Sequence, residues 1–243
     1  PIMFKENSLS TFIEQFKKAT EKGNRYYSNS KKIFSSNLSV DEFSRAASEW
    51  AYNNTYHGHF KNNEGRSKNT IVTDALVGKI GEFLVYKFFK NRGYDPSYPD
   101  LKLRSKGEWD DGDMVVDGKK ISIKTSSSAA NFLRLRRSDW DESGNYLYGQ
   151  EGLDDSYKAV FFCRIKPDIR KILSNKDYTL EEFVDECSNI TWAGEVTGFV
   201  RKEDVANAIK EGMVFKKSTI VDWGMEMYFD QIYFQTGCLR DPD

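Results

Sequence analysis

The sequence predicts an α/β fold in which helices flank a mixed central β-sheet, preceded by a mainly helical N-terminal region. Two observations support this class. Patterns with the 3.6-residue spacing of helices interleave with apolar, strand-like runs over residues 71–243. Residues 1–70 show mainly the helical spacing. The length of 243 residues suits one large domain with an appendage, so we expect an N-terminal region over 1–70 and an α/β domain over 71–243.

Composition narrows the class of protein. A hydrophobic fraction of 39% and a charged fraction of 30% are typical of a globular chain in water. No apolar run approaches the ~20 residues that cross a bilayer, and the N-terminus lacks the charged-then-apolar plan of a signal peptide. Three widely spaced cysteines without a CxxC pair favour free thiols in a reducing compartment. We therefore expect a cytoplasmic protein with no membrane partner.

The N-terminal region is expected to hold two helices. In "SLSTFIEQFKKATEKG", Ser10 is a candidate N-cap and Gly23 a candidate stop. In "SVDEFSRAASEWAYNN", Ser39 stands three residues before Glu42, which is the spacing of a capping box. The polar, Asn-rich stretch over 53–70 that follows predicts a loop.

The α/β domain begins with a strong helix pattern. The stretch "TDALVGKIGEFLVYKFFKNRG" predicts a helix that starts at Thr73 or Asp74 and stops at Gly93. A nearly all-apolar strand is expected over Tyr157–Ile165. Helices and strands then alternate towards the C-terminus, in the order helix "LEEFVDECS", strand "ITWAGEVTGFV", helix "RKEDVANAIKEG" and strand "MYFDQIYFQTG".

A β-hairpin is expected in "DMVVDGKKISIKT", with Asp117 and Gly118 as the central residues of a type I′ turn. Counting outward from this turn places Asp113 opposite Ser122. Because side chains alternate between the two faces of a strand, Lys124 shares a face with both. Opposed Cβ atoms lie ~5 Å apart, so these three side chains converge on one patch. An ordinary hairpin with an incidental Asp–Lys pair has the same pattern. The other face is expected to meet the core through Met114, Val116, Ile121, Ile123 and Thr125.

The helix before the hairpin carries an acid among small and apolar residues. At 100° per residue, Gly78, Glu82, Val85 and Phe89 form one stripe. Gly78 and Gly81 each cost ~1 kcal/mol of helix stability relative to alanine, which indicates close packing of this helix against the sheet. A glutamate at such a packed edge requires a partner such as a metal ion or a lysine, because burying an unpaired charge is costly.

These motifs, "GKIGEFLVYKFF" followed by "GD" and "VDGKKISIKTS", resemble the PD-(D/E)xK nuclease superfamily and, within it, the type II restriction endonucleases. Matched position by position, Glu82 corresponds to the acid of the helix, Asp113 to the acid of the second strand and Lys124 to the lysine of the third. The later segments "NFLRL", "DDSYKAVFFCRI" and "GEVTGFVRKEDV" resemble further family elements, so the resemblance covers residues 73–205. The sequence departs from the family at Ser122, where the family has Asp or Glu.

The resemblance implies a Mg²⁺-dependent endodeoxyribonuclease, with Mn²⁺ as a substitute ion, that hydrolyses phosphodiester bonds in double-stranded DNA. Asp113, Glu82 and the carbonyl of Ile123 would hold the metal, because Mg²⁺ prefers a few oxygen ligands and keeps several waters. Lys124 would orient the attacking water and offset charge on the phosphate. Glu82 is the simplest donor for the acid that is missing at Ser122. The alternative donors are Asp139, Asp141 and Glu142.

Charge distribution adds a candidate DNA surface. Between Lys119 and Arg137 there are six basic residues and no acid, whereas residues 108–113 contain four acids in six positions. This arrangement suits a phosphate polymer with a divalent ion, and it equally describes two solvated loops of opposite sign. The candidate DNA contacts are Lys119, Lys120, Arg134, Arg136 and Arg137.

The expected function is sequence-specific cleavage by a homodimer, because a palindromic DNA site calls for a two-fold symmetric protein. Two alternatives remain open. One is a DNA-binding module that keeps the nuclease fold with a degraded site. The other is a nuclease of phage DNA processing or repair.

Overall fold

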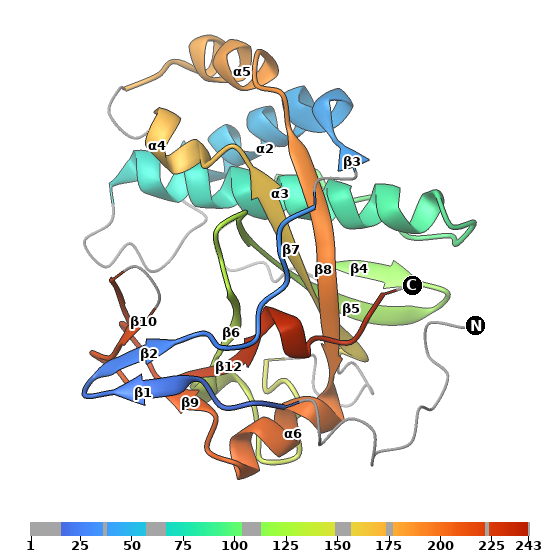
Figure 1. The fold of residues 1–243 in the computed structure, drawn as a ribbon. Coiled ribbons are helices and arrows are strands. Elements are labelled where there is room, and N and C mark those ends of the chain that lie inside the picture. The colour runs from blue at the N-terminus through green and yellow to red at the C-terminus, as the bar shows by residue number, and fades with distance from the viewer. Residues whose placement is uncertain are drawn as a thin grey trace. The chain divides into compact units, whose positions relative to one another are not determined.

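A computed structural model describes residues 16–35, 38–56, 67–103, 113–148, 157–173, 177–221 and 224–242 (Figure 1). Helices and strands alternate along the chain and form sheets with flanking helices, which confirms the predicted α/β class. Two compact units are present, and neither is continuous in sequence. Unit 1 comprises 1–33, 130–162 and 197–243, and unit 2 comprises 34–129 and 163–196. Among the described residues, no helix combines the length and apolar character needed to span a membrane.

Unit 2 contains a sheet of five strands in the order β3-β8-β7-β5-β4. Its strands are β3 (Leu38–Ser39), β4 (Met114–Val116), β5 (Lys119–Ser127), β7 (Ala159–Lys166) and β8 (Ala193–Arg201). Its helices are η2 (Asp41–Phe43), α2 (Ser44–Tyr56), α3 (Lys68–Lys90), α4 (Ile169–Leu173) and α5 (Leu180–Ser188). Helix α3 contacts β5 as well as α2 and α4, so it is the element on which the unit 2 core is assembled. Strands β7 and β8 both contain residues of unit 1 as well.

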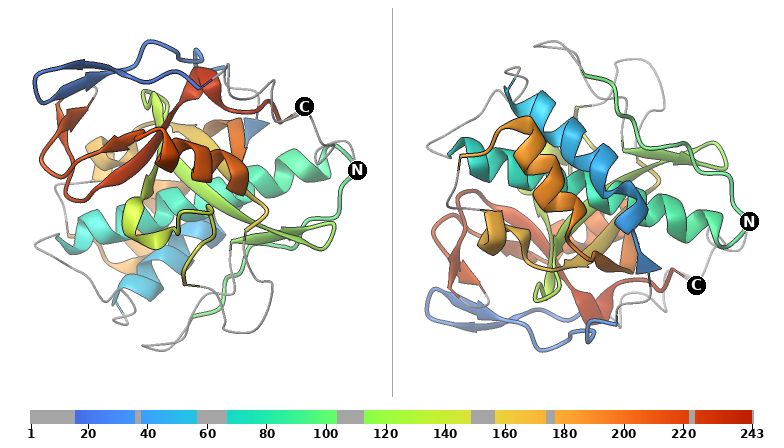
Figure 2. Two further views of the ribbon diagram at one scale, coloured as in Figure 1. Left: turned by 90° about the horizontal axis from the view of Figure 1, so that it is seen from below. Right: turned by 90° about the horizontal axis from the view of Figure 1, so that it is seen from above.

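Unit 1 contains two small sheets, β1-β2-β10-β11 and β6-β12-β9. The strands of the first are β1 (Thr20–Lys22), β2 (Arg25–Tyr27), β10 (Ile220–Val221) and β11 (Met225–Glu226), and Figure 2 shows β2 beside β10. The strands of the second are β6 (Phe132–Arg136), β9 (Val214–Phe215) and β12 (Gln231–Gln235). The unit also holds η3 (Arg137–Asp139), α6 (Lys202–Lys210) and η4 (Thr236–Cys238). Stacking of Phe215 on Tyr233, with ring centroids 4.0 Å apart, lies within its hydrophobic core.

The helix predicted in "SLSTFIEQFKKATEKG" is wrong over its described part, from Phe16 onward. Residues 20–22 form β1, which pairs with β2 across the turn at Gly23 and Asn24. Gly23 adopts a φ of 64°, in the left-handed region that a tight turn requires and that glycine occupies without strain. Strand β2 also pairs with β10 from the far end of the chain. These non-local strand pairings override the local helical spacing; Ser10 lies outside the described residues.

Helix α3 begins earlier than the sequence predicted. Its N-cap is Ser67, whose side chain accepts a hydrogen bond from the backbone N–H of Thr70 at 3.2 Å, so Thr73 and Asp74 lie inside the helix. The predicted stop is confirmed, because the helix ends at Lys90 and Gly93 adopts a φ of 79°. The helix also runs across residue 70, where the sequence placed the division between the two regions.

The predicted helix in "SVDEFSRAASEWAYNN" is confirmed as η2 followed by α2. The predicted capping box is wrong: Ser39 accepts from the backbone N–H of Asp41, and Glu42 forms an ion pair with Lys87 of α3. Further along the chain, the predicted segments correspond to α5, β8, α6 and β12, with ends shifted by a few residues.

The two glycines of α3 differ in their surroundings. A Cβ atom on Gly81 would lie 1.7 Å from Thr125 Oγ1, so α3 and β5 approach each other closely there. A Cβ atom on Gly78 would meet no atom within 4 Å, so the predicted close approach is wrong at that position. Gly81 therefore marks the point where α3 crosses β5.

Alanine substitutions should separate these two glycines by the sign of their effect. Gly78→Ala should raise the free energy of unfolding by up to about 1 kcal/mol, because alanine is the better helix former. Gly81→Ala should lower it by about 1 to 3 kcal/mol, because the methyl group overpacks the contact with Thr125. Urea denaturation of both variants tests this, and adding Thr125→Ala should recover part of the loss in Gly81→Ala. Equal effects of the two substitutions would contradict the packing described for α3.

Candidate active site

The β4–β5 hairpin has the predicted turn and register. Asp117 and Gly118 both have positive φ values, 49° and 73°, as a type I′ turn requires. Val116 pairs with Lys119 and Met114 pairs with Ile121. The apolar face of the hairpin is buried at Met114, Val116, Ile121 and Ile123, as the alternation predicted.

The carboxylate of Asp113 lies at the end of this pairing. Its Oδ2 atom accepts a hydrogen bond from Ser122 Oγ at 2.8 Å and another from the backbone N–H of Ile123 at 2.5 Å. Asp113 is half-buried and Ser122 is 2% exposed. Ser122 therefore has a definite structural role, which is to hold the carboxylate of Asp113 in one orientation.

The peptide of Ile123 faces the same edge as this carboxylate. In an antiparallel ladder, the N–H and C=O of a hydrogen-bonded residue point to the same neighbouring strand. Since β4 ends at Met114, opposite Ile121, the side chain of Asp113 takes the place of the next backbone partner for the Ile123 N–H. The carbonyl oxygen of Ile123 is thus directed to the edge that Asp113 occupies.

The predicted lysine lies close to this edge. Lys124 follows Ile123 on β5, is exposed, and by alternation points to the face that Asp113 and Ser122 share. Lys119 and Lys120, at the start of the same strand, are half-buried. The hairpin therefore brings together a carboxylate, a peptide carbonyl and an exposed ammonium group.

Glu82 belongs to a second polar group, centred on Lys79. The ammonium of Lys79 donates to Glu82 Oε2 at 2.6 Å and to the carbonyl oxygen of Asp100 at 2.8 Å. It also lies 4.0 Å from the centroid of the Trp50 ring of α2. The Lys79 side chain is 1% exposed and that of Glu82 is 13% exposed. Glu82 was expected to need a metal ion or a lysine as its partner, and the structure supplies a lysine one helical turn earlier.

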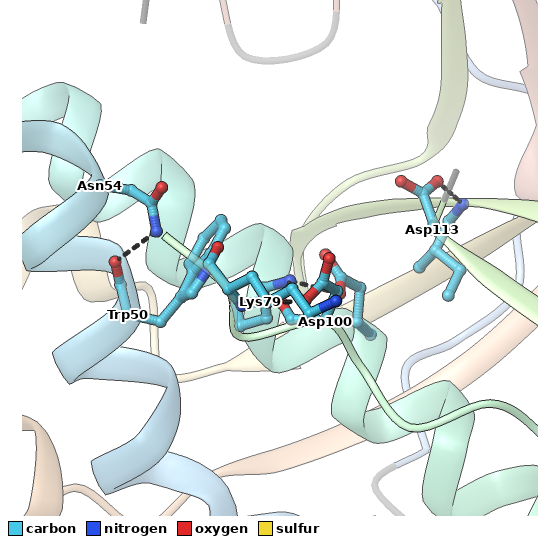
Figure 3. A network of polar contacts seen from close by, with 8 residues as sticks. Trp50, Asn54, Lys79, Asp100 and Asp113 are labelled. Atoms are coloured by element: carbon cyan, nitrogen blue, oxygen red, sulfur yellow. Dashed lines mark hydrogen bonds and ion pairs between the residues drawn. The ribbon is translucent and has the colours of Figure 1, made fainter. Parts of the chain in front are cut away.

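The two polar groups remain separate. In Figure 3, a dashed line joins Lys79 to the carbonyl oxygen of Asp100, and another joins Asp113 to a backbone nitrogen, which is that of Ile123. Among the described residues, no hydrogen bond or ion pair joins Asp113 to Glu82.

The position of α3 explains this separation. Gly81 packs on Thr125, which places the helix over the face of β5 opposite that of Ser122 and Lys124. Ser122 lies three positions before Thr125, or about 10 Å along the strand. Glu82 thus belongs to a helix that packs on one face of β5, whereas Ser122 and Lys124 point to the other face.

The donor atoms at this edge suit Mg²⁺ in kind. No described residue donates a hydrogen bond to Asp113 Oδ1, and the Ile123 carbonyl faces the same edge. Mg²⁺ prefers such oxygen ligands and commonly keeps several waters, so one carboxylate and one carbonyl fit it. Within the described part of the chain, no three His, Cys, Asp or Glu side chains gather as a metal site. The acids that precede Asp113 lie outside the described residues and are Glu108, Asp110 and Asp111.

The three arginines predicted to contact DNA lie in unit 1 and all have partners there. Arg134 donates to the sulfur atoms of Met225 and Met227, at 2.7 and 3.6 Å. Arg137 donates to the carbonyl oxygen of Trp140 and forms an ion pair with Glu142. Arg136 has a 45% exposed side chain, 4.0 Å from Asp139, and its guanidinium lies 3.9 Å from the centroid of the Phe229 ring.

Arg136 is accordingly the arginine whose charge reversal should report phosphate binding most directly. Arg136→Glu should weaken binding to all duplex sequences about tenfold. The slope of log K against log salt concentration is negative, and it should become less steep by about 0.9 for each phosphate that the variant no longer binds. Fluorescence anisotropy over a salt series measures both quantities. Lys210→Glu, at an exposed lysine of α6, is the control. Loss of preference for one target with unchanged general binding would instead make Arg136 a base-reading residue.

The acids predicted as alternative metal ligands stabilise the loop after β6. Asp141 accepts from the backbone N–H groups of Ser143 and Asn145 and from the Asn145 side chain, which holds the pKa of Asp141 below its usual range. Glu142 pairs with Arg137, and Asp139 accepts from Ser138 at 3.0 Å. All three lie in unit 1, whereas Asp113 lies in unit 2.

Sequence reasoning missed Lys79, although a signal for it was present. Lysine and glutamate three residues apart on a helix are neighbours, so the spacing of Lys79 and Glu82 already indicated a pair. The contributions of Trp50 and Asp100 arise from tertiary contacts that no local pattern encodes.

Comparison of the chain with protein-family models, curated proteins and solved structures found no match.

Proposed function

We propose that this protein is a Mg²⁺-dependent endodeoxyribonuclease that hydrolyses phosphodiester bonds in double-stranded DNA, of the type II restriction kind. The observation that carries the proposal is the arrangement at the end of the β4–β5 pairing. There, the Asp113 carboxylate is fixed against the Ile123 peptide, and the exposed Lys124 follows on the same strand.

Each residue has a role that its chemistry allows. Asp113 Oδ1 and the Ile123 carbonyl would hold the metal ion, which supplies positive charge to a phosphate that becomes more negative during hydrolysis. Lys124 would donate hydrogen bonds to the phosphate and orient the attacking water. Ser122 positions Asp113 through its hydroxyl group. Glu82 would add a second carboxylate from α3.

Digestion of unmodified phage DNA with Mg²⁺ or Mn²⁺, followed by mapping of the cut ends, tests the proposal. A type II enzyme should give discrete fragments with one sequence at every end. A homodimer should recognise a palindrome, and sedimentation with duplex DNA should give two protein chains per site. Cuts at ends, nicks or junctions without a sequence preference would instead support a nuclease of repair or phage DNA processing.

A DNA-binding module without catalysis is the second candidate, and two contacts favour it. Asp113 Oδ2 is already satisfied by two hydrogen bonds, and Glu82 is paired with a buried lysine, so both acids have partners without a metal. Mn²⁺ binding, followed by electron paramagnetic resonance, separates the candidates. A nuclease should bind Mn²⁺ and lose it in Asp113→Asn, whereas a binding module should retain duplex DNA binding with no Mn²⁺ bound at this residue.

A further inference from the structure

The N-terminal arm, defined as residues 16–33 of unit 1, carries a strong and one-sided charge. It contains six basic residues and one acid, a net charge of +5, although the whole chain has a net charge of −1. The remainder of the chain therefore carries −6, and the arm differs from it in sign. The basic residues are Lys17, Lys18, Lys22, Arg25, Lys31 and Lys32.

The backbone of the arm is fixed by buried polar side chains. Gln235 of β12 is fully buried, and its Oε1 atom accepts from the backbone N–H groups of Asn29 and Ser30 at 2.7 and 2.9 Å. Its Nε2 atom donates to the carbonyl oxygen of Lys17. Thr236 is also fully buried and accepts from the backbone N–H of Lys32 at 3.0 Å. These bonds hold the arm as an ordered strap.

Most of the basic side chains are exposed to solvent. Lys32 alone donates inward, to the carbonyl oxygen of Thr197 at 2.9 Å. Five basic residues are exposed and form no ion pair within the described part of the chain, namely Lys17, Lys18, Lys22, Arg25 and Lys31. Glu21, the acid of the arm, lies across the strand pair from Tyr26, and burial together with their hydrogen bond raises the pKa of Tyr26. Within the described residues, Glu21 forms no ion pair with these cations, so the arm keeps its positive charge.

We infer that the N-terminal arm is a binding surface for the phosphate backbone of duplex DNA. Duplex DNA carries one negative charge per ~1.7 Å of its axis, so exposed cations on an ordered backbone bind it by releasing counterions. The ordered backbone lowers the entropic cost of aligning the side chains with phosphates. The inference rests on the proposed DNA substrate, but it does not require that the protein cleaves DNA.

Lys22 and Arg25 are the sharpest place to test this surface. They face each other across the β1–β2 turn, so reversing both changes the charge without removing any hydrogen bond that fixes the arm. The double variant Lys22→Glu with Arg25→Glu should weaken metal-free binding to a short duplex at least tenfold. The negative slope of log K against log salt concentration should also become less steep by about 0.9 for each phosphate that the variant no longer binds. The swap Lys22→Arg with Arg25→Lys keeps both charges and should bind as the wild type does.

Two controls make the outcome decisive. Circular dichroism melting should show the same midpoint for both double variants, and Lys210→Glu should leave the salt slope unchanged. If the charge-reversed variant binds DNA like the wild type while Arg136→Glu binds more weakly, the arm is not a binding surface, and the proposed function is unaffected. If the wild type binds through the arm but cuts no DNA with Mg²⁺ or Mn²⁺, the inference holds and the proposed catalysis fails. A wild-type protein that binds no duplex would overturn both.

Discussion

Replacing Asp113 by asparagine should abolish cleavage of duplex DNA, with a loss of at least about 100-fold, while the protein stays folded. The amide oxygen can still accept hydrogen bonds from Ser122 and Ile123, so the end of the hairpin keeps its shape. The negative charge needed by a divalent ion is removed. Lys124→Ala should cause a similar loss without a change in stability, because the side chain is exposed. Cleavage under single-turnover conditions and thermal melting of each variant measure these effects.

Matched substitutions elsewhere in unit 2 serve as controls. Asp185→Asn on α5 and Lys171→Ala on α4 remove the same groups from exposed positions, and both should cleave at the wild-type rate. Asp113→Ala is a useful third variant, since loss of a negative charge near phosphate should tighten metal-free DNA binding. If either Asp113→Asn or Lys124→Ala cleaves DNA at the wild-type rate, the assignment of the active site to this hairpin is wrong.

Glu82→Gln should reduce cleavage as much as Asp113→Asn does, and it should also lower the stability of the fold. The buried ammonium of Lys79 would face a neutral amide, so the free energy of unfolding should fall by about 1 to 3 kcal/mol. Cleavage should fall at least about 100-fold if Glu82 supplies the acid that is missing at Ser122. Ser122→Ala should cleave DNA at a rate within about tenfold of the wild type, because Asp113 keeps its hydrogen bond from Ile123. Its free energy of unfolding should fall by about 1 kcal/mol, because the hydrogen bond from the Ser122 hydroxyl is lost.

Asp74→Asn provides the matched control on the same helix. Asp74 pairs with Arg170 on the surface of unit 2, so its loss should leave cleavage unchanged. All variants should be assayed at a temperature at which melting curves show each to be folded. If Glu82→Gln is fully active, Glu82 does not supply the missing acid, and Asp139, Asp141 and Glu142 are the next candidates. If Ser122→Asp converts an inactive wild type into a nuclease, the natural site is degraded and the DNA-binding candidate is the correct one.

The hairpin could be predicted because its geometry is determined locally. Asp117 and Gly118 specify a two-residue turn, the turn specifies the register, and the register places Asp113 opposite Ser122. In the stripe predicted on α3, Val85 and Phe89 are buried as expected, whereas Gly78 and Glu82 are half-buried. The proximity of Asp113 to the Ile123 N–H was not, because it depends on where β4 stops, and no pattern in "GDMVV" encodes that point.

The incorrect predictions before Gly23 and at Gly78 share a physical cause, which is contact between distant parts of the chain. The segment before Gly23 has helical spacing, yet Thr20 pairs with Tyr27, and β2 pairs with β10 from near the C-terminus. Similarly, Gly78 and Gly81 look equivalent in sequence, and only the position of Thr125 distinguishes them. The pairing of Lys79 with Glu82 is different, because these residues are three apart on one helix and their spacing could have indicated the contact.

The course of the chain also limits how this protein can be divided or recombined. The chain passes between the units at residues 33/34, 129/130, 162/163 and 196/197, and the last two passages fall inside β7 and β8. No single cut can therefore release one unit whole, and a cut at 162/163 or 196/197 divides a strand. Exchange of a contiguous segment that contains one of these passages would alter both units. Fragments split at any one position should accordingly function only when both are co-expressed.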